Sequence, residues 1–482
     1  MKITSKGLFK TYIFRFSCMA VGLSSVLTAC DEKELLNPLP ETSVQADLVF
    51  STPSRVLGQV NGLYKALKHA NFLGGRYVML SDIRGEDFLN RLNNIFTGYD
   101  AWNHTINSGS NDALTTWSSA YAAINASNLL IDGLAANPDV VSAELKAQYI
   151  AEAKFVRALS YYCLITFYGQ PYVKDGGASP GIPLRLSGQM TSENNNMPRS
   201  TVAAIYSQIL KDLDEAEAAL PLNYSSALLN TTRAHRNTAI ALKTRVYLSM
   251  GMNDKVMLEA QKIVPSTAPY RSATGVAHQL QPSILTIFRS DYTTTESIFS
   301  MPMTALDYVS GQSSLGYEFN TNQEYSMNPS GIYGNPGWRS SDVRKTMFRS
   351  NASGTYLTKY MHPTFLDYVP VLRYSEVLLN YAEAAAKSGD LVKGAELLVA
   401  VRQRSDAGYV FPALVISSQD ALVSTILVER RIEFLGEGFR SNDLLRNLLT
   451  IPSKGTAPSI SPAQPEYIFP IPNAEISANN DL

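Results

Sequence analysis

Cysteine and histidine are scarce in this chain of 482 residues. Three Cys are too few for a disulfide framework at this length. The five His are scattered, and neither an HExxH pattern nor a Cys/His spacing typical of a metal site occurs. A P-loop and a GxSxG nucleophile elbow are absent as well. The sequence therefore predicts no resident metal or cofactor, and it predicts no catalytic residue.

An excess of charge of one sign is also lacking. The chain has 41 Lys and Arg against 42 Asp and Glu, a net charge of −1, which argues against a nucleic acid as partner. Hydrophobic residues make up 45% and charged residues 17%, enough apolar material for a substantial core and too much for a disordered chain. The 26 Tyr outnumber the 18 Phe. This excess suits a wet surface that must also stack on a ligand.

The first 29 residues have the pattern of a secretory signal. Four basic residues and no acid precede an apolar run at 16–29, which is too short to span a membrane. The run ends in Leu27-Thr28-Ala29-Cys30, which resembles a bacterial lipobox, and an acidic cluster follows it, as in surface-exported lipoproteins of Bacteroidetes. We predict a lipoprotein signal peptide at 1–29, lipidation of Cys30 and a tether at 30–53. The alternative is an ordinary signal with a chance Cys.

Helical periodicity governs most of the remaining sequence. Residues 143–169 are apolar on nearly every face from Ala153 to Tyr168, which indicates a helix buried among others. Residues 237–264 and 371–404 each read as a helix, a tight turn and a second helix, and the stretch from Pro370 is close to the tetratricopeptide repeat length. Further helices are expected at 54–69, 113–136 and 201–220. Cys163 lies in an apolar helix segment and is expected in the core.

Other parts of the chain are rich in turn-forming residues. Residues 70–112 and 174–200 contain many Gly, Pro and Asn, and 265–369 form a long insertion of similar composition with short β-prone segments. Ordered loops of this length more often carry function than merely connect helices. We predict a mainly α fold in which helical repeat elements at about 113–264 and 370–446 support this loop-rich insertion, with little β structure.

Several motifs in fixed order resemble the SusD/RagB family of outer-membrane nutrient-binding lipoproteins. The most specific are EAKFVRALSYYCLITFYGQPYV from Glu152, LRYSEVLLNYAEAAAKSGD from Leu372 and ILVERRIEFLGEGFRSNDLLR from Ile426. The Trp117-x3-Tyr121 spacing, ALKTRVYLSMG at 241–251 and the ending PIPNAEISANNDL agree with it. Together these motifs extend the resemblance over almost the whole chain from residue 54.

The resemblance implies a fold and a role. It implies tetratricopeptide-like helix pairs, a lipid anchor at the outer-membrane surface and a SusC-like TonB-dependent transporter as partner. It also implies binding of an oligosaccharide or polysaccharide without catalysis. It does not identify binding residues, because these vary with the glycan within the family.

Candidate binding residues come instead from the chemistry of sugars, whose apolar faces stack on aromatic rings and whose hydroxyls pair with amide, carboxylate and guanidinium groups. Three loop-rich segments offer this mixture, at 82–107, 317–323 and 333–339. The predicted ligand-binding residues are Asp82, Arg91, Asn93, Tyr99, Trp102, Asn103, Tyr317, Asn320, Tyr333 and Trp338. The alternative for each aromatic residue is that it pins its loop to the core. Trp117, at helical spacing with Tyr121, is expected in the core.

The densest charge cluster lies at 429–440. Glu433 and Glu437 could be read as a glycosidase pair, but residues four apart on one helix point the same way and do not flank a sugar. The pattern favours an ion-pair network between helices, and we expect the same role for Glu152 with Arg157 and for Arg373 with Glu376. A surface glycoside hydrolase stays the weaker alternative. A helical-repeat adaptor and a peptide-binding nutrient lipoprotein are two further ones.

Overall fold

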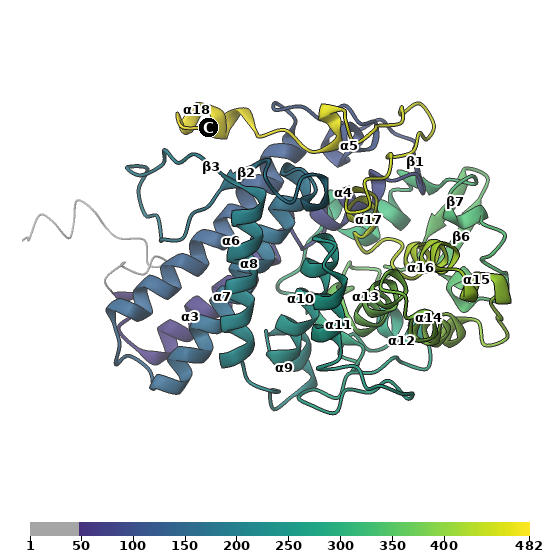
Figure 1. The fold of residues 1–482 in the computed structure, drawn as a ribbon. Coiled ribbons are helices and arrows are strands. Elements are labelled where there is room, and N and C mark those ends of the chain that lie inside the picture. Colours follow the sequence, from purple (N-terminus) through teal and green to yellow (C-terminus); the bar gives the residue numbers. More distant parts are fainter. Residues whose placement is uncertain (1–47) are drawn as a thin grey trace, which may run out of the picture. The chain divides into compact units, whose positions relative to one another are not determined.

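Helices dominate the computed structural model, which describes residues 48–482 (Figure 1). The predicted signal peptide, Cys30 and most of the tether lie outside the described residues. All helices and strands discussed below belong to one unit, Thr52–Leu482. Within residues 48–482, no helix is both long enough and apolar enough to cross a bilayer. The mainly α fold class predicted from the sequence is confirmed.

The first half of the unit is a layer of long helices. These are α3 (Pro53–Leu67), α6 (Asn111–Ala136), α7 (Ala143–Tyr168) and α8 (Val202–Ala219). The hydroxyl groups of Ser142 and Thr201 cap α7 and α8 by accepting backbone N–H groups of the first turn. Helix α7 packs against both α6 and α8, and its second half is buried on all faces, as its composition predicted. Trp117 and Cys163 are buried, as expected.

The second half contains the predicted helix pairs. Its helices are α10 (Arg236–Ser249), α11 (Asn253–Ala260), α13 (Tyr374–Lys387), α14 (Leu391–Ser405) and α16 (Gln419–Glu433). Gly389 lies in the turn between α13 and α14 and has a φ of 91°, a conformation that residues with a side chain rarely adopt. Asp390 then caps α14 through the backbone N–H of Lys393 at 3.0 Å. Helix α11 packs on α13 and α14 packs on α16, so the pairs stack on one another.

Shorter elements fill the spaces between the long helices. The short helices are α4 (Arg76–Ile83), α5 (Tyr99–Trp102), α9 (Ala227–Thr232), α12 (Ile284–Arg289), α15 (Ala413–Ser417), α17 (Arg440–Leu445) and α18 (Asn473–Ala478). The strands are β1 (Phe88–Asn90), β2 (Pro180–Pro183), β3 (Arg199–Thr201), β4 (Ser297–Met301), β5 (Tyr325–Met327), β6 (Phe348–Asn351), β7 (Gly354–Leu357) and β8 (Val369–Arg373). They form four antiparallel pairs, β1–β5, β2–β3, β4–β8 and β6–β7. The insertion at 265–369 is therefore ordered, although few of its residues lie in long elements.

Two predicted ion pairs have other partners. Glu152 pairs with Arg233 at 2.6 Å, whereas Arg157 pairs with Asp212 at 2.7 Å. Residues five apart on a helix are rotated by about 140°, so Glu152 and Arg157 face different neighbours.

The second predicted ion pair, Arg373 with Glu376, is also wrong. Arg373 ends β8 in extended conformation and reaches Glu296 and Glu437, at 2.8 and 2.7 Å. Glu376, in the first turn of α13, pairs instead with Arg245 at 2.6 Å. A strand residue and a helix residue three positions apart do not share a face, so the spacing rule for helices does not apply to them.

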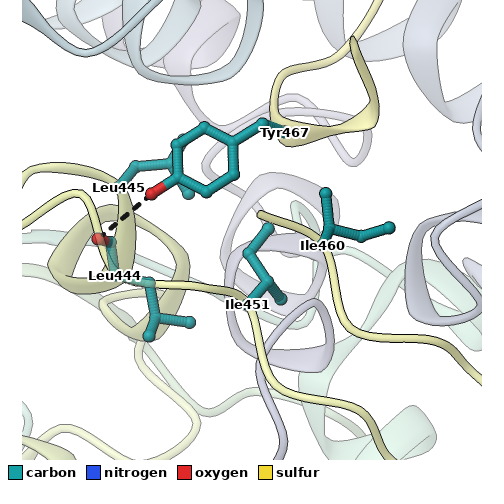
Figure 2. Close-up of a cluster of buried hydrophobic side chains, with 5 residues drawn as sticks. All are labelled: Leu444, Leu445, Ile451, Ile460 and Tyr467. Carbon is teal, nitrogen blue, oxygen red and sulfur yellow. Dashed lines mark hydrogen bonds between the residues drawn. The ribbon is translucent and has the colours of Figure 1, made fainter. Parts of the chain in front are cut away.

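A hydrophobic cluster fixes the C-terminal segment on α17. It consists of Leu444, Leu445, Ile451, Ile460 and Tyr467 (Figure 2). The Tyr467 hydroxyl donates to the carbonyls of Leu449 and Leu444, at 2.8 and 3.4 Å. Ile451 and Ile460 face each other across an antiparallel bridge. The loop between them closes at Gly455, whose Cα lies against the Trp102 ring, since an added Cβ would come within 3.2 Å of it.

Candidate functional site

The β1–β5 pairing brings together loops that are far apart in the sequence. Asn90 pairs with Tyr325, so the loop after β1 runs beside the segment before β5, and the Arg91 N–H donates to the Glu324 carbonyl at 3.0 Å. The β6–β7 hairpin joins them, because the Arg91 guanidinium donates to the Tyr356 hydroxyl. We call the surface formed by residues 91–103, 317–323 and 348–357 the loop face. It gathers residues from two of the three predicted segments.

Buried polar groups fix the backbone of the loop face from the interior of the unit. The Glu324 carboxylate accepts hydrogen bonds from Thr97 Oγ1 at 2.6 Å and from Asn90 Nδ2 at 3.1 Å. Arg76, at the start of α4, donates to the Phe96 carbonyl at 2.5 Å. These bonds orient the turn at 94–97, so that the Phe96 side chain is 61% exposed. The loop therefore presents an aromatic ring to solvent from a supported backbone.

A second buried carboxyl lies beside Glu324. Burial and, to a smaller extent, the neighbouring Glu324 carboxylate together raise the pKa of Glu318 to about 9. Glu318 is therefore protonated at neutral pH, which removes the repulsion between the two acids. Neither Glu318 oxygen has a hydrogen-bond partner among the described residues. The pair supports the loop face without being exposed on it.

Six of the ten predicted residues lie on the loop face. These are Arg91, Asn93, Tyr99, Asn103, Tyr317 and Asn320, each exposed or half-buried. The Asn90 carboxamide shapes the turn around Asn93, whose φ is 54°, by accepting the Asn93 N–H at 2.7 Å. Tyr99 stacks on Trp102 with ring centroids 5.8 Å apart, which leaves its other face toward the surface. These six residues thus lie on segments that the β1–β5 pairing and its neighbouring loops join.

Two of the predicted residues lie in the interior instead. Trp102 is only 3% exposed, and its indole N–H donates to the Phe88 carbonyl at 2.8 Å. Asp82 accepts the backbone N–H groups of Gly438 and Arg440, at 3.1 and 3.2 Å. Burial raises the pKa of Asp82 to about 7. Both residues join distant parts of the chain, and neither offers a surface to a ligand in this structure.

The last two predicted residues lie in a separate aromatic cluster. The ammonium group of Lys345 sits 4.1 Å from the Tyr333 ring centroid and 4.2 Å from that of Trp338. Trp338 is 4% exposed and also packs against Phe348. A lysine thus already occupies the ring faces that a sugar would need.

The loop face also contains residues that the sequence analysis missed. Phe96 is its most exposed aromatic side chain. Arg349 donates to the Asn320 carbonyl at 2.6 Å, and Asn351 donates to Gln323 Oε1 at 3.0 Å. The unbroken run of polar and small residues at 349–355 could have indicated this exposed hairpin.

The carboxylates of α16 form part of a buried ion-pair network. Glu433 is fully buried and accepts from Arg344, Arg373 and Arg404, at 2.9, 2.9 and 2.5 Å. Burial favours a raised pKa, but these guanidinium groups outweigh it and hold the pKa of Glu433 well below its usual range. Glu437 accepts from the same Arg373 at 2.7 Å. Two carboxylates that share one guanidinium do not face each other across a cleft, which supports the structural interpretation.

Other reactive side chains are enclosed. Burial raises the pKa of the Cys163 thiol to about 12, so the thiol is not activated. Burial lowers the pKa of His278 to about 4 and that of His235 to about 3, and their rings stack 5.3 Å apart. Within residues 48–482, no three His, Cys, Asp or Glu side chains are grouped so that they could hold a metal ion.

Comparisons with known proteins agree on one family. A family model described as "Starch-binding associating with outer membrane" matches residues 59–248, and one described as "SusD family" matches residues 241–458. A SusD superfamily protein from Bacteroides fragilis is 33% identical in sequence. The match to its crystal structure covers 90% of this chain and 99% of the Bacteroides fragilis chain, with a TM-score of 0.82.

Two more distant proteins have the same fold or sequence pattern. The SusD-like protein P38 of Formosa agariphila is 21% identical over 92% of this chain and 93% of its own length. A solved structure described as a "Laminarin binding SusD-like protein" is 22% identical, with a TM-score of 0.68, and covers 89% of this chain and 98% of its own.

Proposed function

Because this chain belongs to the SusD/RagB family, we propose that it binds oligosaccharides at the outer surface of a bacterium and delivers them to a SusC-like TonB-dependent transporter. In this proposal the protein is not an enzyme. It captures the glycan reversibly and releases it unchanged. The description of one family model as starch-binding and of one structural relative as laminarin-binding supports a glycan as the ligand.

The exposed Phe96 ring on the loop face is the observation that carries the proposal. Buried hydrogen bonds hold this apolar ring outward, where it can stack on the C–H face of a sugar. Tyr99 follows three residues later, at the start of α5. Arg91, Asn93 and Asn320 contribute donors and acceptors for hydroxyl groups to the same loop face. We therefore place the binding site on the loop face and omit Asp82, Trp102, Tyr333 and Trp338.

Anchoring at the membrane belongs to the same proposal. Acyl chains on Cys30 would hold the protein at the outer membrane, and several chains are needed, because one alone binds reversibly. Mass spectrometry of the mature protein should find acyl groups on residue 30. The Cys30→Ser variant should leave the membrane fraction. Purification from outer membranes in detergent should yield a complex in which the second subunit is a TonB-dependent transporter.

Calorimetric titration tests the glycan site. The mature chain with Cys30→Ser would be titrated with a panel of defined oligosaccharides, beside Phe96→Ala and Tyr99→Ala variants. We expect binding to one class of sugar without product formation. Affinity should be about five- to thirty-fold weaker in the Phe96→Ala variant, since a stacked aromatic anchor contributes about 1–2 kcal/mol. Leu414→Ala is the control, because that side chain is 83% exposed on α15, outside the loop face.

The outcomes separate the alternatives. Binding that Phe96→Ala and Tyr99→Ala leave unchanged would remove the loop face as the site. Turnover of a polysaccharide would favour the surface hydrolase. Failure to bind any sugar, with binding of peptides, would favour a peptide-capturing lipoprotein. An adaptor would bind its partner through helix faces, and the exposed apolar side chains of Val392 on α14 and Leu414 on α15 belong to such faces. In that case Leu414→Ala would weaken the complex and Phe96→Ala would not.

A further inference from the structure

A small polar pocket lies between α6, the loop at 184–197 and α18. It has a volume of about 190 Å³, and none of its lining residues belongs to the loop face. Figure 1 shows α18 and the β6–β7 hairpin at opposite sides of the unit. From the hydrogen-bonded walls and the charge balance of this pocket, we infer that it is a second binding site, for a single neutral sugar ring.

The walls of the pocket are held in place by hydrogen bonds. One face of α6 anchors the loop: Tyr121 donates to the Pro183 carbonyl at 2.7 Å, and Asn128 donates to the Arg185 carbonyl at 3.0 Å. Asn125 makes a reciprocal pair with the backbone of Gln189, at 2.8 and 2.7 Å. The pocket thus exists before a ligand arrives, which lowers the cost of binding.

The C-terminal segment closes the other side. Asn479 makes two hydrogen bonds with the backbone of Met197, each 2.8 Å long, and Asn195 donates to the Ala478 carbonyl. Helix α18 buries none of its own side chains, so these bonds, rather than apolar packing, keep it on the loop. They place Glu475 over the pocket beside Tyr121.

Three side chains offer polar groups to the pocket, and two of them are already partly engaged. Arg185 donates to the carbonyls of Asn194 and Asn195, and Glu475 accepts from Trp117 and Asn479. A guanidinium has five N–H donors and a carboxylate about four acceptor positions, so both keep hydrogen-bonding capacity for a ligand.

The closest approach between the charged groups of Arg185 and Glu475 is 3.7 Å, too long for a direct hydrogen bond, and both side chains are mostly buried. The Gln189 carboxamide makes no side-chain hydrogen bond within residues 48–482, although its backbone is fully used. Adjacent ligand hydroxyls could accept from the guanidinium and donate to the carboxylate and the carboxamide, as hydroxyls do both.

Charge and size select the class of ligand. Arg185 and Glu475 compensate each other, so the pocket favours a neutral molecule over an anion or a cation. A volume of about 190 Å³ corresponds to about six water molecules and lies below the roughly 300–1,000 Å³ of pockets for drug-sized ligands. The Tyr121 ring and the buried Ile124 add an apolar wall. One polyhydroxylated ring fits these features.

The fluorescence of Trp117 can report ligand binding in this pocket. Its indole N–H donates to Glu475 Oε2 at 3.1 Å, and its ring lies 4.9 Å from that of Tyr121. The chain has three Trp, so a Trp102→Phe/Trp338→Phe variant leaves Trp117 as the single fluorophore. The probes are glucose, galactose, mannose and N-acetylglucosamine at millimolar concentration. Saturation-transfer NMR on the unaltered chain repeats the measurement if the double variant does not fold.

We expect one of these sugars to change the Trp117 emission in a saturable way. Gln189→Ala should weaken that binding about five- to ten-fold, the equivalent of one hydrogen bond, and Glu475→Gln by at least as much. Gln312→Ala is the matched control, because Gln312 is exposed and likewise has no side-chain partner in the described part of the chain. Phe96→Ala should leave this signal unchanged, so failure of the loop-face proposal and failure of this one are distinguishable.

Three results would overturn the inference. The first is no saturable response to any of the four sugars by fluorescence or NMR. The second is a response that Gln189→Ala and Glu475→Gln do not alter, which would place the sugar elsewhere. The third is a response to glycine but to none of the sugars, since the guanidinium and the carboxylate would then bind the two charges of a zwitterion.

Discussion

Neutralising Glu433 is expected to destabilise the protein strongly. Its carboxylate is fully buried and accepts hydrogen bonds from Arg344, Arg373 and Arg404. In Glu433→Gln the shape is kept, but three guanidinium groups share an uncharged neighbour. Removing one partner of a buried ion pair costs about 3–5 kcal/mol. The three guanidinium groups keep other carboxylate partners, but one buried positive charge of the network then lacks a compensating carboxylate.

The size of the unit converts this cost into a change of melting temperature. Unfolding entropy is about 2.1 cal/mol/K per residue, so the unit Thr52–Leu482 has about 0.9 kcal/mol/K. Glu433→Gln should therefore lower Tm by about 3–6 °C in differential scanning calorimetry. The matched control is Glu396→Gln, which breaks a pair with Lys393 at a carboxylate that is 48% exposed. Its Tm should change by less than about 1 °C.

Two outcomes would refute this reasoning. If both variants melted within a degree of the parent chain, the network around Glu433 would not stabilise the fold. If Glu433→Gln kept its Tm but abolished cleavage of a polysaccharide, Glu433 would be a catalytic residue and the hydrolase alternative would replace the structural one.

Two further predictions concern local conformation and pH. Gly389→Ala should destabilise the fold by about 1–2 kcal/mol, because Gly389 has a φ of 91°. Gly58→Ala should stabilise it by about 0.5–1 kcal/mol, because an added Cβ inside α3 meets nothing within 4 Å. Urea denaturation measures both changes in the free energy of unfolding, and changes of the same sign would contradict the argument. The pKa of Glu318 is raised to about 9 in the folded chain. Its protonated carboxyl therefore contributes fully to the free energy of unfolding below the unfolded pKa of about 4.3, and this contribution is lost as pH rises through 9. Glu318→Gln should thus be more stable than the parent at pH 9, with the difference shrinking toward pH 4, and a constant difference would show that Glu318 does not titrate there.

The long helices were predictable because their signals are local. Caps such as Ser142 and Asp390, the turn at Gly389 and the apolar periodicity of α7 all lie within a few residues of the structure that they determine. The helix pairs follow from the same signals, since a short turn between two amphipathic helices makes them neighbours.

The candidate site was predictable only in part. The sequence pointed to the loops that carry Arg91 and Asn320, but it could not separate exposed from buried side chains inside them. Trp102 is buried because a bridge between residues 454 and 457, more than 350 positions away, closes over its ring. Phe96 is exposed because Arg76 and Glu324 turn its backbone outward. Both depend on contacts between distant segments, which composition and spacing do not contain.

The buried ion pairs explain how a helical scaffold holds a loop-rich surface. Long loops bring few apolar side chains to a core, so directional contacts must fix them. Arg344, in the segment Val343–Met347 just before β6, binds Glu429 and Glu433 of α16. Two residues into β6, Arg349 holds the Asn320 carbonyl on the loop face. The network therefore connects the helix pairs to the proposed glycan site through one short segment. Loosening it in Glu433→Gln should weaken glycan binding at temperatures near the lowered Tm, whereas Phe96→Ala should weaken binding at every temperature.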